Sequence, residues 1–458
     1  MIQHFVNRKE ELKFLEEKWD ENKPQLIIIY GRRRIGKSYL VLKFIEGKDS
    51  VYFLARKTNE AENSRRFLET LYEKTKDETL LNMEPTFDSV FLSISKLDKK
   101  MVIVIDEFSW LMEIIPQFAS TLQHYWDTKL QHSKIFLALT GSSISMMESL
   151  FSYKNPLYGR RTGQWKVEPL RFFDIKEFFH EYNSEDLVKV HSIIGGVPFY
   201  LSLFDSSKKL EHNIKEKILN RGNILYEEVE FLLKEELKEP RNYLLIMKAI
   251  AEGKTSFGEI INATGIEKGN MMKYLGVLIT LGMIERQLPV TKLKGKKGLY
   301  YLKDNYSKFW FNFVYPNKER IEANLSDQVL KEILSQLNTF VGVAFENTVK
   351  EFLMELNRRK LLPFMFSKIG KWWHKDKEID LVALNKETKE IAFFEVKWKD
   401  LSHKEALGIL EKLKEKSKFV KWYKGRKEYF GLIAKRIENK KELEKNYLVF
   451  DLKDIEKL

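Results

Sequence analysis

Residues 31–38 read Gly-Arg-Arg-Arg-Ile-Gly-Lys-Ser and directly follow the apolar run Leu26–Tyr30. A glycine, four residues and then Gly-Lys-Ser is the spacing of a phosphate-binding loop. Gly31 and Gly36 let consecutive backbone N–H groups face one anionic phosphate. Lys37 places a positive charge on the β- and γ-phosphates, and the Ser38 hydroxyl ligates Mg²⁺. Since a helix pattern begins at Lys37 and adds its positive end, the segment predicts a nucleoside triphosphate site.

A second strand pattern ends in two acidic residues. Met101–Ile105 is continuously apolar and is followed by Asp106 and Glu107, which is typical of a buried parallel strand. A carboxylate in this place holds the water shell of Mg²⁺, and a following glutamate orients the attacking water. We assign these roles to Asp106 and Glu107. A third such run, Lys134–Leu139, ends in Thr140-Gly141-Ser142-Ser143, whose polar residues either sense the γ-phosphate or cap the next helix.

Two further segments contain residues suited to phosphate chemistry. Arg160 and Arg161 lie between Gly159 and Gly163, and either arginine could stabilise charge on a transferring phosphate, in cis or from a neighbouring subunit. A plain surface loop is the alternative. The run Gly195-Gly196-Val197-Pro198 interrupts an otherwise helical region and marks a sharp break in the chain.

The composition limits the class of protein. A chain of 458 residues with 43% hydrophobic content is long enough for two to four domains. It contains no cysteine, which excludes disulfides, thiolate zinc sites and a cysteine nucleophile. Neither a signal peptide nor an apolar run near membrane-spanning length is present, so we expect no membrane contact and a cytoplasmic location.

The net charge of +13 is unevenly distributed along the chain. Residues 241–303 contain 11 Lys and Arg against 4 Asp and Glu, and residues 331–458 contain 29 against 21. These two parts therefore carry the whole positive excess. The asymmetry favours DNA as a partner of residues 241–303 and 331–458; a lysine-rich, heat-adapted surface is the alternative.

Residues 240–310 have the pattern of a winged helix-turn-helix. Helices are expected at 243–251, 256–263 and 267–281, and strands at 284–286 and 299–302, around a basic tip at 292–298. Lys268, Asn270 and Lys273 would lie early on the recognition helix. Lysines of the tip, Lys294, Lys296 and Lys297, would contact phosphates. A protein-contact or lid module is the alternative reading of the same pattern.

Two strand patterns, Ile379–Leu384 and Ile391–Val396, flank a polar turn near the C-terminus. A hairpin centred between residues 387 and 388 places Asp380 directly across from Glu395, with Lys397 on the same face. Facing carboxylates repel each other unless a cation lies between them, and a nearby lysine can stabilise charge on a phosphate. The hairpin therefore predicts a metal-assisted site; a surface hairpin with an ion pair is the alternative.

The N-terminal motifs together resemble the archaeal ATPase family, a branch of the STAND/AAA-like P-loop ATPases. The matching segments are Asn7-Arg8-Lys9-Glu10-Glu11-Leu12, the phosphate-binding loop, Val104–Glu107, Thr140–Ser143, Gly159–Gly163 and Gly195–Pro198. The resemblance covers about the first half of the chain. It implies ATP with Mg²⁺, and a parallel five-stranded core with the Asp106 and Thr140 strands beside the phosphate-loop strand. It also implies adenine packing near residues 5–8 and a helical lid that touches the nucleotide. The expected nucleotide contacts are Asn7, Arg8, Gly31, Arg34, Gly36, Lys37, Ser38, Tyr39, Thr140, Gly195 and Pro198.

Asp380 and Glu395-Val396-Lys397 resemble the PD-(D/E)xK nuclease site, and Glu346, on an expected helix over 343–356, matches the first-helix acid of its Holliday-junction-resolvase-like branch. The resemblance implies Mg²⁺ or Mn²⁺ held by Asp380 and Glu395. A further active-site element on the next helix has two candidates, Lys412 and Lys416.

We therefore predict an α/β protein with four parts: a P-loop ATPase core at 1–170 with a parallel sheet, a helical lid at 171–239, a winged helix-turn-helix at 240–310 and a restriction-endonuclease-like α/β domain at 330–458. Two functions remain open. One is an ATP-gated, metal-dependent DNA nuclease; the other is an ATPase switch that controls DNA binding or protein assembly, with a non-catalytic last domain. A monomer, a dimer and a ring all remain open, and arginines acting in trans would require an assembly.

Overall fold

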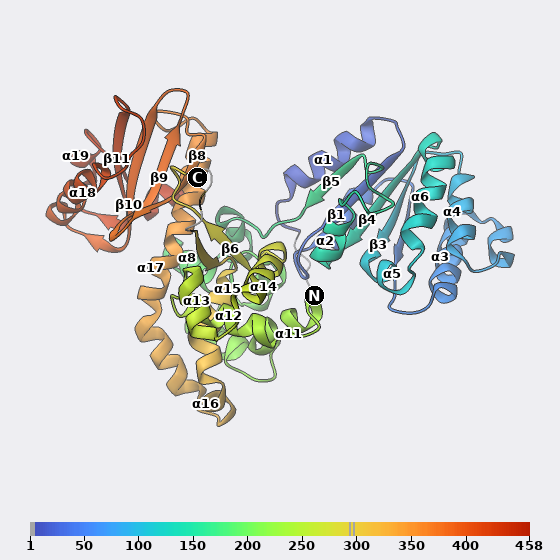
Figure 1. Ribbon diagram of the computed structural model, residues 1–458, viewed down its shortest axis with the longest axis horizontal. Coiled ribbons are helices and arrows are strands. Elements are labelled where there is room, and N and C mark those ends of the chain that lie inside the picture. Colours follow the sequence, from blue (N-terminus) through green and yellow to red (C-terminus); the bar gives the residue numbers. More distant parts are fainter. Residues whose placement is uncertain (1–4, 293–294, 296–297) are drawn as a thin grey trace. The chain divides into compact units, whose positions relative to one another are not determined.

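The computed structural model describes residues 5–292, 295 and 298–458, which form two compact units (Figure 1). The first unit runs to Pro169 and also includes Val197–Phe199. The second unit consists of Leu170–Gly196 and Tyr200–Leu458. The segments expected to form the lid, the winged helix and the C-terminal domain thus belong to one compact unit. Their boundaries within it stay predictions.

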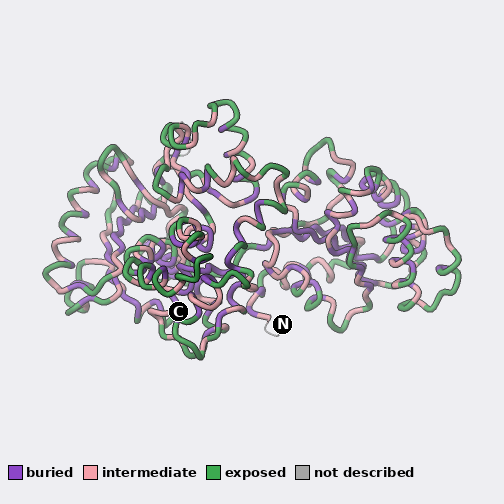
Figure 2. Tube along the Cα trace, turned by 90° about the horizontal axis from the view of Figure 1, so that it is seen from below, coloured by how far each residue is buried: buried purple, intermediate pink, exposed green. Residues whose placement is uncertain are grey.

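The first unit is built on a parallel sheet whose strand order is β2-β3-β4-β1-β5. Its elements are α1 (Lys9–Asp20), β1 (Gln25–Tyr30), α2 (Lys37–Ile45), β2 (Ser50–Leu54), α3 (Glu60–Thr75), α4 (Phe87–Ser95), β3 (Met101–Asp106), α5 (Phe108–Ile114), α6 (Phe118–Thr128), β4 (Ile135–Gly141), α7 (Ile144–Ser149) and β5 (Gly163–Lys166). Every residue of β1, β3 and β4 is buried, and Figure 2 shows buried segments in the interior and exposed ones at the periphery. Continuous apolar runs are what strands covered on both faces require.

The strand order corrects one expectation. The Thr140 strand, β4, pairs directly with β1, as predicted. The Asp106 strand, β3, does not pair with β1, because β4 lies between them. Asp106 and Thr140 nevertheless meet, since neighbouring parallel strands end at the same edge of the sheet.

The second unit is helical in its first half and ends in a sheet. Its elements are α8 (Ser184–Ile194), α10 (Leu210–Asn213), α11 (Ile224–Glu236), α12 (Arg241–Ala251), α13 (Phe257–Thr264), α14 (Lys268–Thr280), β6 (Ile284–Gln287), β7 (Leu299–Leu302), α15 (Asn305–Phe309), α16 (Lys318–Glu322), α17 (Ser326–Arg358), β8 (Lys368–His374), β9 (Lys377–Asn385), β10 (Glu390–Leu401), α18 (His403–Ser417), β11 (Lys427–Ile437), α19 (Lys440–Leu443), β12 (Leu448–Phe450) and α20 (Leu452–Glu456). The helix α9 (Pro198–Leu203) begins in the first unit and continues into the second. Among the described residues, no helix combines the length and apolar character needed to cross a membrane.

Three helices and a hairpin follow one another at 241–302. Ser256 caps α13 through a capping box with Glu259, and β6 pairs with β7 in antiparallel register. Ser256 also forms an antiparallel bridge with Leu299 of β7, which ties the start of α13 to the hairpin. The expected tip lysines Lys294, Lys296 and Lys297 lie outside the described residues.

The C-terminal sheet has the strand order β12-β11-β10-β9-β8. β8, β9 and β10 are antiparallel neighbours, whereas β11 and β12 run parallel to β10. The predicted hairpin register is confirmed: pairs run from Glu390 with Asn385 to Phe394 with Leu381, one residue before Glu395 and Asp380. The preceding helix, α17, is 33 residues long, far longer than the expected 343–356 helix.

Buried polar contacts connect α17 to the start of the second unit. Thr348 Oγ1 of α17 lies 3.4 Å from His191 Nδ1, and the His191 carbonyl accepts from the Asn305 amide of α15 over 2.9 Å. Burial lowers the pKa of His191 to about 4, so this ring is neutral in the folded protein. The Phe172 N–H donates to Glu351 Oε2 over 2.7 Å. Residues far apart in sequence therefore share one polar interior.

Glu351 generates a prediction about stability and pH. Burial raises the pKa of its carboxyl to about 7, above the value of about 4.3 that an unfolded chain gives. Between these values the folded protein retains a proton that the unfolded chain releases, so stability falls as pH rises through this window. Glu351→Gln removes the titration while keeping an acceptor for Phe172.

We expect this variant to gain roughly 3 kcal/mol over the natural protein above pH 7, and nothing below about pH 4. Thermal unfolding of both proteins from about pH 4 to pH 8 measures the difference. A gain that does not change with pH would show that Glu351 does not titrate in this range.

Candidate functional site

The phosphate-binding loop connects the buried strand β1 to the start of α2. Gly31 has a φ of 155°, and a Cβ there would lie 2.5 Å from the Val167 carbonyl oxygen, so only glycine fits. Lys37 is 6% exposed. Its ammonium donates to the carbonyls of Gly31 and Arg32 over 3.0 and 3.1 Å. The lysine thus lies folded within the loop that its charge is expected to serve.

Asp106 is the centre of a dense group of donors at the end of β3. It is 2% exposed. Its Oδ2 accepts from Ser38 Oγ over 2.7 Å and also from the Tyr52 hydroxyl. Its Oδ1 accepts from Thr140 Oγ1 and, over 2.9 Å, from the Glu107 N–H. The structure therefore brings the predicted residues Ser38, Asp106 and Thr140 together.

Ser38 and Asp106 offer a hydroxyl and a carboxylate oxygen 2.7 Å apart beside the loop. Mg²⁺ prefers hard oxygen donors and usually takes one or two of them from protein, with phosphate and water completing its shell. The donor set therefore fits Mg²⁺ held together with a nucleotide. In this arrangement Tyr52 and Thr140 orient the carboxylate.

Glu107 is positioned by its backbone and by one serine. Its φ of 54° lies in the left-handed region, which non-glycine residues rarely adopt and which clusters at functional sites. Ser142 Oγ lies 3.0 and 2.7 Å from the two carboxylate oxygens. A carboxylate held in this way next to Asp106 is suited to orient water.

The residues expected around the nucleotide occupy several kinds of place. Arg8 is 7% exposed and donates to the carbonyls of Ile35 and Glu168, so its guanidinium braces the loop. Asn7 precedes it with a φ of 55°. The Arg34 guanidinium lies over the Phe199 ring at 4.7 Å, and Tyr39 is 45% exposed on α2.

Pro198 and Gly195 belong to different compact units. A Cβ at Gly36 would lie 3.9 Å from Pro198 Cγ, so the proline lies beside the phosphate-binding loop. Gly195 instead ends α8 in the second unit with a φ of 66°.

Arg160 and Arg161 have partners of their own. Arg160 forms a two-bond pair with Asp127, over 3.2 and 3.0 Å, which raises the pKa of the guanidinium. Arg161 lies over the Phe151 ring at 4.6 Å, and that ring packs on Tyr30 at the end of β1. A role for Arg160 at a phosphate would require it to leave Asp127.

The C-terminal hairpin places a lysine between two carboxylates. Lys397 Nζ donates to Asp380 Oδ2 over 3.1 Å and to Glu395 Oε2 over 2.8 Å. The Val396 N–H also donates to Asp380. Burial alone would lower the pKa of Lys397, but the charges of Asp380 and Glu395 outweigh it and raise that pKa. Of the two lysines considered on the next helix, Lys416 reaches Glu395 Oε1 over 2.6 Å.

Glu346 lies near this group but is engaged elsewhere. It forms an ion pair with Lys371 of β8, and Lys371 also lies 3.6 Å from Glu378. Burial raises the pKa of Glu346, and the neighbouring charge of Asp380 contributes to the rise. Two acids of the predicted site thus share Lys397, while the third is held by Lys371.

Divalent metal would find suitable oxygen atoms here, but not an open place. Carboxylates suit Mg²⁺ and Mn²⁺, and Asp380 and Glu395 converge from adjacent strands. The place between them is occupied by the Lys397 ammonium. Among the residues that the structure describes, no group of three or more acidic or histidine side chains is placed to hold a metal. Metal binding therefore requires Lys397 to move away from a carboxylate.

Sequence reasoning missed three partners, Tyr52, Asp127 and Lys371, and it named Ser142 without its contact to Glu107. Tyr52 stands beside Val104 in the β2–β3 register, two positions before Asp106, and only the pairing of these strands shows it. Ser142 lies within the Thr140–Ser143 motif, so its place one strand away from Glu107 gave a usable signal. Asp127 and Lys371 carry no local signal, because their partners lie far away in sequence.

Two parts of the chain match known protein families. Residues 5–204 match a family described as an ATPase domain predominantly from Archaea, and residues 310–409 match a family of archaeal and bacterial proteins of unknown function. An uncharacterized protein of Methanocaldococcus jannaschii is 41% identical over 453 residues, which cover 98% of this chain and 99% of that protein.

More distant relatives match about two thirds of the chain. An uncharacterized ATP-binding protein of the same organism is 24% identical over 314 residues, covering 60% of this chain and 90% of that protein. The solved structure of a Walker-type ATPase from Pyrococcus abyssi matches with a TM-score of 0.52 at 20% identity, covering 67% of this chain and 96% of that one. This structural likeness shows the fold.

Ser142 allows a test of how Glu107 is positioned. Ser142→Ala removes the hydroxyl that donates to Glu107, so we expect kcat for ATP hydrolysis to fall roughly tenfold. KM for ATP should change less than about twofold, because Lys37 and the loop are untouched. Steady-state phosphate release measures both constants. Ser133→Ala, at the opposite end of β4, is the matched control and should behave as the natural protein; a fall confined to ATP affinity would contradict the role given to Ser142.

Proposed function

The chain belongs to the family of P-loop ATPases found predominantly in Archaea, here joined to a C-terminal domain of the second family, and from this premise we propose that ATP binding and hydrolysis in the first unit control DNA binding and metal-dependent DNA cleavage in the second. Magnesium with ATP belongs to the first site, and Mg²⁺ or Mn²⁺ to the second. The match of residues 5–204 to the ATPase family supports ATP binding and ATPase activity. What the chain acts on is the proposal.

The observation that carries the cleavage proposal is the group Asp380, Glu395 and Lys397. These side chains converge from neighbouring strands, and Lys416 joins them from the following helix. A bound divalent ion would supply a Lewis acid for the phosphodiester and a water of lowered pKa. Asp380 and Glu395 would hold that ion. Lys397, displaced from between them, would stabilise negative charge on the phosphate, and Lys416 would keep Glu395 oriented.

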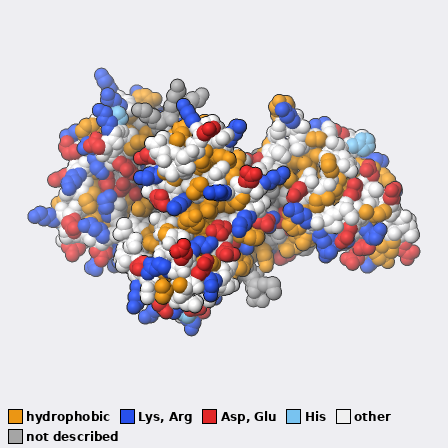
Figure 3. Space-filling view, turned by 60° about the horizontal axis from the view of Figure 1, so that its bottom comes forward, with side chains coloured by type: hydrophobic (Ala, Val, Ile, Leu, Met, Phe, Trp, Pro, Cys, Tyr) orange, Lys and Arg blue, Asp and Glu red, His pale blue; other side chains and the backbone are white. Residues whose placement is uncertain are grey.

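DNA binding is supported by charge and by the 241–302 segment. Three helices, a hairpin and the Ser256–Leu299 bridge form the order of elements expected of a winged helix. Lys268, Asn270 and Lys273 are exposed on α14, where such a module contacts DNA. Figure 3 shows Lys and Arg side chains interspersed with Asp and Glu on the visible face. Binding would therefore use local groups of lysines on α14.

Coupling between the sites is supported by the route of the chain. Val197–Phe199 belongs to the first unit, while Gly196 and Tyr200 belong to the second. Pro198 lies beside Gly36, and Phe199 lies under Arg34. A change in the phosphate-binding loop thus acts directly on a segment whose two ends are covalently fixed in the other unit.

A cleavage assay with a matched pair of variants tests the proposal. Branched, single-stranded and duplex DNA are incubated with Mg²⁺ or Mn²⁺, with and without ATP. We expect Asp380→Asn to lose at least about 100-fold in cleavage rate, because it removes an oxygen ligand and a charge. Asp376→Asn makes the same change at an exposed position in the β8–β9 turn and should cleave normally. Absence of cleavage by the natural protein, or equal cleavage by both variants, would falsify the nuclease proposal.

A second function is favoured by the Lys397 ion pairs. They already neutralise Asp380 and Glu395, so the group also suits a purely structural role in an ATP-dependent switch. In that case Lys37→Ala should change DNA affinity or oligomeric state severalfold, since it disables the nucleotide site. Asp380→Asn should leave both unchanged. Lys43→Ala, an exposed position on the same helix, is the control, and fluorescence anisotropy with light scattering measures the outcome.

A further inference from the structure

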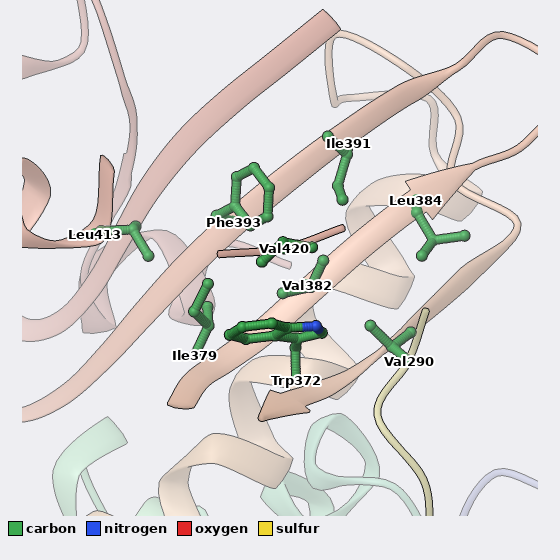
Figure 4. Packing of buried hydrophobic residues seen from close by; sticks show 9 residues of the cluster. All are labelled: Val290, Trp372, Ile379, Val382, Leu384, Ile391, Phe393, Leu413 and Val420. Atoms are coloured by element: carbon green, nitrogen blue, oxygen red, sulfur yellow. The ribbon is translucent and has the colours of Figure 1, made fainter. Parts of the chain in front are cut away.

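The turn that follows β6 is docked on the edge strand of the C-terminal sheet. Val290 is 3% exposed and belongs to the apolar core that contains Trp372, Ile379 and Val382 (Figure 4). Its N–H donates to the Lys371 carbonyl over 2.9 Å. The Lys368 ammonium donates to the carbonyls of Val290 and Lys292, over 2.8 and 3.1 Å. The turn thus serves as an additional edge contact of β8.

Lys371 links this docked turn to the candidate cleavage site. Its backbone carbonyl accepts from Val290, and its ammonium pairs with Glu346 of α17. Both side chains of the pair are largely buried, Lys371 at 21% and Glu346 at 16% exposed. A shift of the turn therefore acts on β8 at the residue that holds Glu346.

The pairing also decides how many carboxylates are available to a metal. Glu346 is bound to Lys371, and Lys371 lies opposite residues 380–381 in the β8–β9 pairing. Asp380 and Glu395 share Lys397. Among the described residues, no group of three acids is placed to hold a metal.

We propose that docking of residues 289–292 on β8 keeps the cleavage site closed, because Lys371 then holds Glu346 away from Asp380 and Glu395. DNA bound by residues 241–303 opens the site by drawing the turn off β8. Released from Lys371, Glu346 becomes the third carboxylate ligand of the divalent ion, which takes the place of the Lys397 ammonium between Asp380 and Glu395. Lys371 is thus a positioning residue. The inference rests on the proposed nuclease function.

The docking can be locked by a disulfide. A Cβ built at Gly370 lies 3.6 Å from Val290 Cβ, within the range of about 3.5–4.5 Å found in disulfides. The φ of Gly370 is outside the left-handed region, so cysteine fits its backbone. Because the chain has no cysteine, Val290→Cys with Gly370→Cys provides the only thiols. The two single variants are the matched controls.

The measurement is Mn²⁺ affinity by calorimetry, with the protein saturated by an uncleavable phosphorothioate duplex, together with the cleavage rate on ordinary DNA. We expect the reduced double variant to behave as the natural protein. The oxidised form should bind Mn²⁺ at least tenfold more weakly in the presence of DNA and should cleave at least tenfold more slowly. Reduction with a phosphine should restore both.

A second variant keeps the test independent of the disulfide. Lys371→Met frees Glu346 without moving the turn, so Mn²⁺ should bind at least fivefold more tightly than to the natural protein in the absence of DNA. Lys377→Met, a partly exposed lysine on the neighbouring strand, is the control and should not change the affinity. Circular dichroism establishes that each variant is folded.

The possible results separate the two proposals. Equal Mn²⁺ affinity and cleavage in the oxidised and reduced forms, with no gain in Lys371→Met, overturn the docking inference and leave the nuclease function standing. Absence of both Mn²⁺ binding and cleavage in every form, including Lys371→Met, overturns the nuclease function and the inference with it.

Discussion

A carboxylate removed from water destabilises a protein unless hydrogen bonds or opposite charge compensate it, and both candidate sites of this chain are built around such carboxylates. Asp106 is compensated by neutral donors: hydroxyls of Ser38, Tyr52 and Thr140 and one backbone N–H. These bonds satisfy its oxygens but leave its negative charge in place. The site therefore retains its attraction for a cation. Asp380 and Glu395 are compensated by the charge of Lys397, so their site already contains its cation.

The two sites were not equally predictable from the sequence. The phosphate-binding loop, the Asp106 strand and the Thr140 strand are contiguous motifs, and parallel strands necessarily bring their ends together. The hairpin register was also predictable, because strand periodicity fixes which residues share a face. By contrast, the order of β3 and β4 beside β1 is set by tertiary packing. The Arg160–Asp127 and Glu346–Lys371 pairs join distant residues, and no local pattern marks them.

The same distinction applies to the division into parts. Composition and the positions of glycine and proline suggest a lid, a winged helix and a final domain. Apart from Val197–Phe199, however, the structure packs these segments into one compact unit. The reason lies in α17, which extends over 33 residues. Its Thr348 and Glu351 meet the beginning of the unit, while Glu346 faces the C-terminal site. A sequence window that recognises only residues 343–356 as helical cannot show that this helix connects the two.

The positive excess of the second unit must be weighed against how its lysines are used. Lys371, Lys397 and Lys416 neutralise carboxylates within the fold, and desolvation lowers the pKa of the half-buried Lys308. Nearby carboxylates of the protein neutralise their charges, so these lysines add little to the long-range electrostatic attraction for a polyanion. What remains for a polyanion is the exposed set, of which Lys268 and Lys273 share α14. The exposed charge of this unit therefore argues for DNA contact at α14. The lysines around Asp380 argue instead that ion pairs control the access of a metal ion to its carboxylates.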